Sequence, residues 1–143
     1  MENTSWLLPS TPCWFDLQEP DLTKEAYLLA KIADFEENKG KVTIFINVEK
    51  KEKKEVALSL ISQTNQNLKE LGEEDMVDMA CLNEAEILNN IKRRYEQNLI
   101  FTYIGPTLMV VNPYKNMKGE FEEEKRIIYE NLVDKKKKHY IIY

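Results

Sequence analysis

Asn112 and Pro113 are the residues whose types and spacing best suit ligand binding in this chain. They follow the apolar run 108–111, so they begin a loop at the end of a predicted strand. An asparagine amide can both donate to and accept from the edge of a purine base, and proline offers a flat apolar surface to a ring. Ligands often bind at the carboxyl ends of strands in α/β sheets. Asn-Pro is also a common turn, which is the alternative interpretation.

A capped amphipathic helix is predicted upstream of this loop. Asn83 is a favoured N-cap residue, and Glu86, three positions later, completes a capping-box pattern. The basic residues 92–94 fall in the last turns, where positive charge suits the helix dipole. The apolar stripe of this helix consists of Ile87, Leu88, Ile91 and Tyr95.

A hairpin connects the helix to the Asn-Pro loop. Residues 99–104 and 108–111 have strand composition, and the Gly-Pro pair at 105–106 forces the turn between them. Further along, residues 120–132 can form a charged helix, and residues 139–143 read as the first residues of another strand.

The N-terminal half has the composition of a small β domain. Residues 27–35 could be helical by propensity, but their neighbours need a partner strand, which favours a strand there. The expected strands include 27–35, 41–48 and 55–61. The predicted fold class is α+β, with a small antiparallel β-barrel followed by a capped helix, a β-hairpin and a further helix. The expected divisions are a tail at 1–11, the barrel at 12–62, a polar linker at 63–73 and a second part at 74–143.

Composition limits the class of protein. The chain has 143 residues, 43% apolar and 31% charged, which fits a globular protein. The net charge is -5, and the lysine runs are interleaved with or followed by acids, so nucleic acid is not an expected partner. No apolar run approaches the roughly 20 residues that span a bilayer. The N-terminus lacks a basic region and a long apolar core, so we expect a cytoplasmic protein with reduced Cys13 and Cys81.

The sequence offers no catalytic or metal-binding constellation. His139 is the only histidine, so neither a histidine-pair metal site nor a Ser-His-Asp triad is available. Gly40-Lys41 is not a phosphate-binding loop, because Val42 follows it and Phe35 stands where the first glycine is required. The aromatic residues Trp6, Trp14 and Phe15 either mark a peptide-binding groove or are buried in the small barrel.

Residues 74–115, taken together, resemble the start of a myosin motor domain. That family has an acidic-Asp-Met opening, a helix ending in Arg-Tyr, a Leu-Ile-Tyr-Thr-Tyr-Ile-Gly strand and a Val-Asn-Pro-Tyr-Lys loop. Residues 13–62 resemble more loosely the Src-homology-3-like barrel that precedes many myosin motors. The matching residues are Glu74, Asp75, Met76, Leu82, Glu84, Ile87, Leu88, Asn90, Ile91, Arg94, Tyr95, 99–105 and 111–115.

The resemblance implies an ATP-dependent, actin-based cytoskeletal motor that uses Mg²⁺. It places Asn112, Pro113, Tyr114 and Lys115 in the adenine loop, with Phe121 as the nearest aromatic residue to pack on the base. The family often has a basic residue near Asn116, a proline near Lys118 and a tyrosine near Glu120, and this chain departs from that pattern at these positions.

The sequence lacks the family's phosphate loop, magnesium-binding switches and actin-binding elements. We therefore expect the 143 residues to be an N-terminal piece that does not hydrolyse ATP by itself. We expect the hairpin 99–111 to have no partner strand within this chain and to be covered by the rest of the motor domain. The alternatives are a truncated, non-catalytic protein whose barrel binds a partner peptide, and a gene fragment without independent function.

Overall fold

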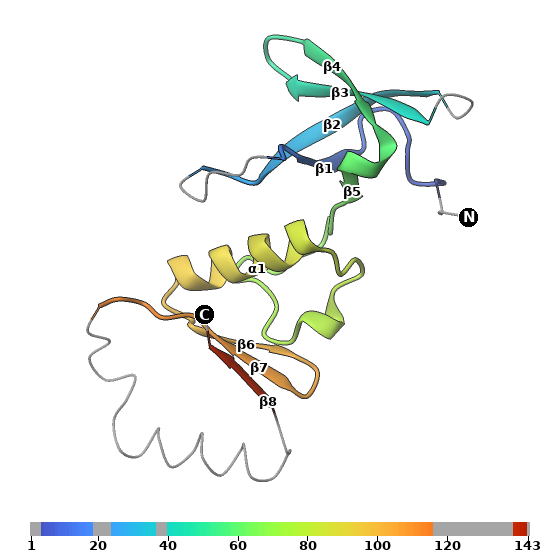
Figure 1. Cartoon of the computed structure of the whole chain (residues 1–143). Helices are drawn as coiled ribbons and strands as arrows, with labels where there is room; N and C mark the ends of the chain where they lie inside the picture. The colour runs from blue at the N-terminus through green and yellow to red at the C-terminus, as the bar shows by residue number, and fades with distance from the viewer. Residues whose placement is uncertain (1–3, 19–23, 37–39, 116–138, 143) are drawn as a thin grey trace, which may run out of the picture. The chain divides into compact units, whose positions relative to one another are not determined.

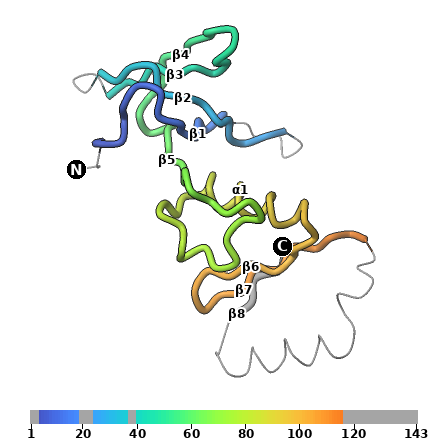
Figure 2. The backbone as a smooth tube through the Cα atoms, turned by 180° about the vertical axis from the view of Figure 1, so that it is seen from behind, coloured from blue at the N-terminus to red at the C-terminus, as the bar shows by residue number. Residues whose placement is uncertain are grey.

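The computed structural model describes residues 4–18, 24–36, 40–115 and, by their backbone, 139–142. The chain divides into two compact units, Met1–Asn65 and Gln66–Tyr143. Figures 1 and 2 show the first as a sheet and the second as a helix with a smaller sheet. The α+β class predicted from the sequence is confirmed, since the described elements are mostly antiparallel strands with one α-helix.

The first unit is a five-stranded antiparallel sheet with the order β4-β3-β2-β1-β5. The segment 27–35 is a strand and not a helix, as favoured from the sequence. Among the described pairings β4 and β5 are the two edges, so the sheet does not close into the expected barrel. The strands are β1 (Pro12–Asp16), β2 (Tyr27–Glu36), β3 (Lys41–Asn47), β4 (Glu52–Ala57) and β5 (Ile61–Gln63).

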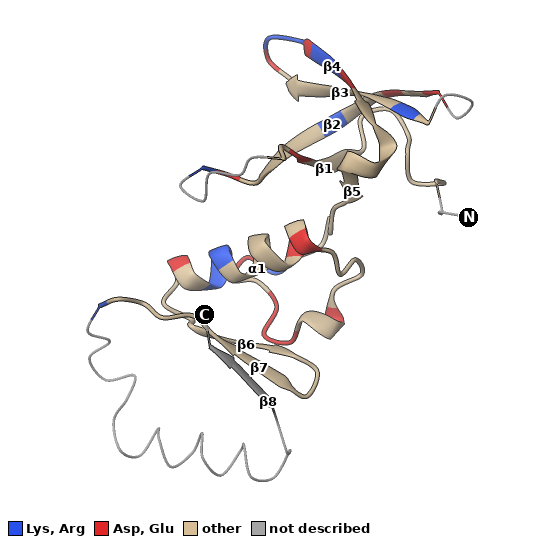
Figure 3. Ribbon diagram, in the orientation of Figure 1, with Lys and Arg blue, Asp and Glu red and all other residues tan. Residues whose placement is uncertain are grey.

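A short 3₁₀ helix, η2 (Leu58–Leu60), connects the two edge strands of this sheet. One continuous strand was expected over 55–61, but η2 separates β4 from β5 and allows β5 to pair with β1 instead. The outer strand β4 carries two acids and two lysines (Figure 3), a composition that discourages pairing with another chain. Lys54 also lies over the buried ring of Phe15, 5.0 Å from its centroid.

Apolar residues on one face of this sheet form its core. They meet across neighbouring strands, because Cys13 pairs with Ala30, Ile32 with Ile44, and Val42 with Val56. All six are buried. The segment expected to be a tail also contributes to this core, since the side chain of Leu7 is only 5% exposed. Burial of such side chains contributes about 1.5–3 kcal/mol each.

The second unit packs the helix α1 (Glu84–Glu96) against a three-stranded sheet of order β6-β7-β8. The sheet consists of β6 (Phe101–Ile104), β7 (Thr107–Val110) and β8 (His139–Ile142). A 3₁₀ helix, η3 (Met76–Asp78), supplies Met76, which is fully buried beside Met79 and Met109. Ile87 and Ile91 of α1 reach the same cluster, which fixes the helix on the sheet.

The predicted helix start and hairpin are confirmed. The side chain of Asn83 accepts a hydrogen bond from the backbone N–H of Glu86 at 3.1 Å, as an N-cap does. The expectation that the hairpin has no partner strand in this chain was wrong, because β8 pairs with β7 in parallel. The predicted helix at 120–132 lies outside the described residues. No helix in the described ranges is long and apolar enough to cross a membrane.

Candidate functional site

The Asn-Pro loop follows β7 directly and is held in a defined turn. The side-chain Oδ1 of Asn112 accepts a hydrogen bond from the backbone N–H of Tyr114 at 2.9 Å. This contact is an Asx turn, and it accompanies a left-handed backbone at Tyr114, whose φ is 49°. The side chain of Tyr114 is 91% exposed, and Asn112 is exposed as well, so the loop presents its polar groups to solvent.

The end of α1 anchors this loop through two side chains. The hydroxyl of Tyr95 donates to the carbonyl oxygen of Pro113 at 3.2 Å. The Nζ of Lys115 donates to Oδ1 of Asn98, which lies just beyond the helix C-cap. Both ends of the Pro113–Lys115 segment are thus bound at the C-terminal end of α1, which limits the number of conformations that the loop can adopt.

The hydrogen bonding of Asn112 determines what the amide can offer a ligand. Its Oδ1 accepts from Tyr114 and keeps a second lone pair, while the Nδ2 group offers two donors for recognition. Such a donor suits a ring nitrogen or carbonyl acceptor on a purine edge. Pro113 is half-buried and Lys115 is exposed. The predicted residue Phe121, and the departures at Asn116, Lys118 and Glu120, lie outside the described residues.

Behind the loop, α1 has a buried polar face that was not expected from the sequence. Arg94 was assigned to the helix dipole, yet it is only 7% exposed. Its Nε donates to Oγ1 of Thr102 at 3.0 Å, and its Nη2 donates to the carbonyl of Phe101 at 2.8 Å. Leu88, assigned to the apolar stripe, is 51% exposed. The available signal was the spacing by four of Glu86, Asn90 and Arg94, which places three polar residues on one helix face.

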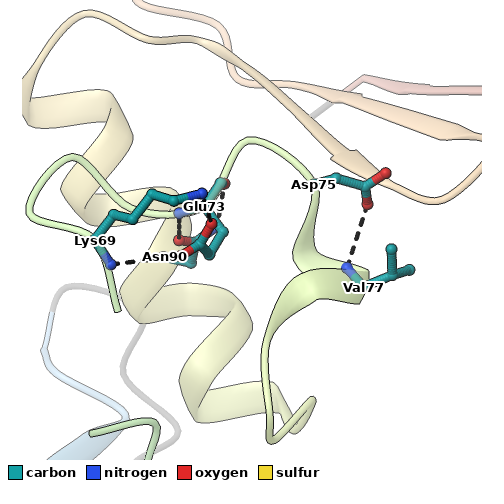
Figure 4. A network of polar contacts seen from close by, with 5 residues as sticks. All are labelled: Lys69, Glu73, Asp75, Val77 and Asn90. Carbon is teal, nitrogen blue, oxygen red and sulfur yellow. Dashed lines mark hydrogen bonds and ion pairs between the residues drawn. The ribbon is translucent and has the colours of Figure 1, made fainter. Parts of the chain in front are cut away.

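The side chain of Asn90 hydrogen-bonds to the backbone of Glu73 (Figure 4). Its Oδ1 accepts from the N–H of Glu73 at 2.7 Å, and its Nδ2 donates to the carbonyl of the same residue at 3.0 Å. Gly72 lies against this amide, because a Cβ built there would come within 2.7 Å of Oδ1 of Asn90. The segment 63–73, expected to be a polar linker, is therefore docked on α1 at its end.

A salt bridge forms within the same segment, next to the contact with Asn90. Nζ of Lys69 lies 2.5 Å from Oε2 of Glu73, whose side chain is 9% exposed. The hydrogen bond from Lys69 lowers the pKa of the Glu73 carboxyl, and the same bond raises the pKa of Lys69. Loss of solvation lowers the pKa of Arg94. These contacts hold the segment 69–73 against α1.

Asp75 joins η3 to the turn of the hairpin. Its Oδ1 accepts from the N–H of Val77 at 3.2 Å and from the N–H of Gly105 at 2.8 Å. The neighbouring carbonyl of Glu74 accepts from the N–H of Tyr103 at 2.8 Å, which covers the outer edge of β6. The acidic opening before Met76 thus fixes the hairpin from which the Asn-Pro loop emerges.

The aromatic and cysteine residues considered from the sequence are at least partly buried. Phe15 is buried, and Trp6 and Trp14 are half-buried. Burial raises the pKa of the Cys13 thiol to about 11, and it also raises the pKa of Cys81, so neither thiol is activated. Within the described ranges no cluster of three or more metal-binding side chains occurs.

Comparison with known proteins relates the second unit to one family. The family model of the myosin head (motor domain) matches residues 73–141. The non-muscle myosin heavy chain of Drosophila melanogaster is 57% identical over 44 residues, and human myosin-14 is 50% identical over 44 residues. Each alignment covers 31% of this chain and 2% of the relative, so the matched stretch spans a very small part of either heavy chain.

Proposed function

Because the family model of the myosin head matches residues 73–141, we propose that this chain supplies the purine-binding loop of an ATP-driven, actin-based motor. The observation that carries the proposal is the anchoring of the Asn112 loop by α1. The hydroxyl of Tyr95 holds the carbonyl of Pro113, and Lys115 holds Asn98, so the loop is organised without a ligand. Preorganised groups bind with a smaller loss of conformational entropy.

In this proposal Asn112 recognises the base by donating from Nδ2 to an acceptor on the purine edge. Pro113 supports the face of the ring, Tyr114 and Lys115 border it, and Phe121 packs on it. The phosphates and Mg²⁺ are bound by residues outside these 143, because the sequence holds no Gly-x-x-x-x-Gly-Lys motif. The chain thus contributes base recognition and structural support, within a myosin of the cytoplasmic actin cytoskeleton.

A titration of the ¹⁵N-labelled chain with adenosine tests this proposal. A nucleoside lacks the phosphates, so we expect weak binding, with a Kd on the order of 1 mM or above. The side-chain NH₂ of Asn112 and the backbone N–H of Tyr114 are expected to shift with adenosine and not with uridine. Asn112→Ala should remove the response, whereas Asn67→Ala, an exposed position outside the loop, should retain it. Equal responses to both nucleosides would contradict base recognition.

A second candidate is that the sheet of the first unit binds a partner peptide. The observation that favours it is a cavity of about 210 Å³ beside η2, lined by Trp6, Leu58, Ile61 and neighbouring hydroxyl groups. Uncharged walls with one indole suit an apolar side chain of a peptide. Enrichment of a peptide library on the chain, lost in Trp6→Ala and retained in Trp14→Phe, is the expected result. If no peptide is enriched, the second candidate is wrong and the motor proposal remains.

A further inference from the structure

The second unit contains a cavity that neither the purine loop nor the family match assigns to a ligand. Its volume is about 640 Å³, within the range of roughly 300–1,000 Å³ that is typical of small-molecule sites. One wall comes from the segment 69–74, and the opposite wall comes from the end of α1 and the start of β6. Asn112 and Pro113 are not among the residues that line it.

Arg94 supplies the principal polar group of this cavity. The side chain is only 7% exposed, yet a guanidinium carries five N–H donors and the two hydrogen bonds to Thr102 and Phe101 use two of them. Three N–H donors beyond these two remain on a side chain that lines the cavity, so an acceptor placed there can meet them.

The charges around Arg94 favour a neutral acceptor over an anion. The carboxylates of Glu74 and Glu73 stabilise the charged form of Arg94. Lys69 is already paired with Glu73, and Glu70 adds a further negative charge to the lining. A carboxylate or phosphate ligand would meet this negative charge, whereas a carbonyl or amide oxygen would not.

Much of the remaining lining is apolar, and Asn98 adds one amide to it. Leu71 is 51% exposed and Leu99 is 38% exposed, so both offer apolar surface to a ligand. Phe101 and Tyr103 are half-buried beside them. This surface gains free energy when an apolar ring covers it, at about 25 cal/mol for each Å² removed from water.

We propose that this cavity binds an uncharged small molecule with an apolar ring and a carbonyl or amide acceptor. The acceptor accepts hydrogen bonds from the free N–H groups of Arg94, and the ring lies between Leu71 and Leu99. The buried arginine fixes the position of the acceptor, because its own hydrogen bonds to Thr102 and Phe101 hold the guanidinium in place.

Three aromatic probes separate the possible ligand classes in ¹⁵N titrations of the 143-residue chain. Benzamide carries the neutral acceptor, benzoate carries a negative charge, and toluene has no polar group. The backbone resonances of Leu71, Leu99 and Ile100 are expected to shift, with a benzamide Kd at least threefold lower than those of the other two probes. A tighter benzoate complex, equal binding of toluene, or no saturation by any probe would overturn the proposal.

A matched pair of substitutions locates the site. Leu71 lines the cavity and Leu88 does not, and both side chains are 51% exposed. Leu71→Lys is expected to raise the benzamide Kd at least fivefold, whereas Leu88→Lys should leave it unchanged. Equal effects of the two substitutions would show that benzamide binds elsewhere. Because both positions are exposed, neither variant removes a core residue, and far-ultraviolet circular dichroism checks that both variants fold.

Discussion

The hydroxyl of Tyr95, in the last turn of α1, donates to the carbonyl oxygen of Pro113 at 3.2 Å. The two residues are 18 positions apart, and the whole β6-β7 hairpin lies between them. This contact fixes the Asn-Pro loop relative to the end of α1, so the helix and the candidate site form one structural element.

Tyr95→Phe removes the hydroxyl and keeps the ring. We expect a loss of about 0.5–1.5 kcal/mol in the free energy of unfolding, the usual value for one hydrogen bond. Amide hydrogen exchange at Tyr114 and Lys115 should also accelerate, because the loop loses one of its two anchors. Tyr114→Phe is the control, since that side chain is 91% exposed and its hydroxyl makes no hydrogen bond within the described residues. Unchanged exchange in Tyr95→Phe would contradict the anchoring role.

Asn90→Ala leaves the N–H and the carbonyl of Glu73 buried without their partner. Unsatisfied buried polar groups cost about 1–3 kcal/mol each, so we expect a loss of at least about 2 kcal/mol by urea denaturation. Asn67→Ala, at an exposed position in the same unit, should change the midpoint very little. Similar urea midpoints for the two variants would mean that the Asn90–Glu73 hydrogen bonds contribute no stability.

Gly72→Ala introduces a methyl group against Asn90. The φ of Gly72 is 77°, and the added Cβ would lie 2.7 Å from Oδ1 of Asn90 and 3.0 Å from Cγ of Arg94. Gly105 is a matched comparison, since its φ is 55° but its nearest neighbour, Cγ1 of Val77, is 3.6 Å away. Both variants carry backbone strain of about 1–2 kcal/mol. Gly72→Ala should lose at least about 1 kcal/mol more because of the clash.

The Lys69–Glu73 pair predicts a dependence of stability on acid pH. The folded state lowers the pKa of Glu73, so the unfolded chain binds more protons as the pH falls. The stabilisation is present above the ordinary glutamate pKa of about 4.3 and is lost as the pH falls through the lower folded value. Glu73→Gln should flatten this part of the curve. Glu70→Gln, at an exposed neighbour, should retain the wild-type slope in thermal melts between pH 2 and pH 6.

Local rules predicted the helix start and the hairpin because their determinants lie within a few residues. Asn83 caps the residue three positions later, and the Gly-Pro pair sits at the turn between β6 and β7. The outward position of Leu88 and the burial of Arg94 depend on what α1 packs against, which periodicity does not contain. Polar residues on a helix are ordinarily assigned to solvent, so a buried polar face is missed.

The open sheet of the first unit shows the same limit. Residue composition predicted the strand at 41–48, and the need of its neighbours for a partner favoured a strand at 27–35. Which edges pair depends on the path of residues 58–60, where η2 replaces the middle of an expected strand. For the candidate site, the sequence predicted Asn112 and Pro113, but not the Asx turn that engages the Asn112 oxygen.

The most direct test of base recognition by Asn112 is a search for intermolecular nuclear Overhauser effects between adenosine and the chain. We predict contacts from the H2 or H8 proton of adenine to the side-chain NH₂ of Asn112 and to the ring of Pro113. These contacts should disappear in Asn112→Ala while the fold is retained. Contacts confined to other residues, or unchanged contacts to Pro113 in that variant, would contradict the proposal that this loop binds a purine through the Asn112 amide.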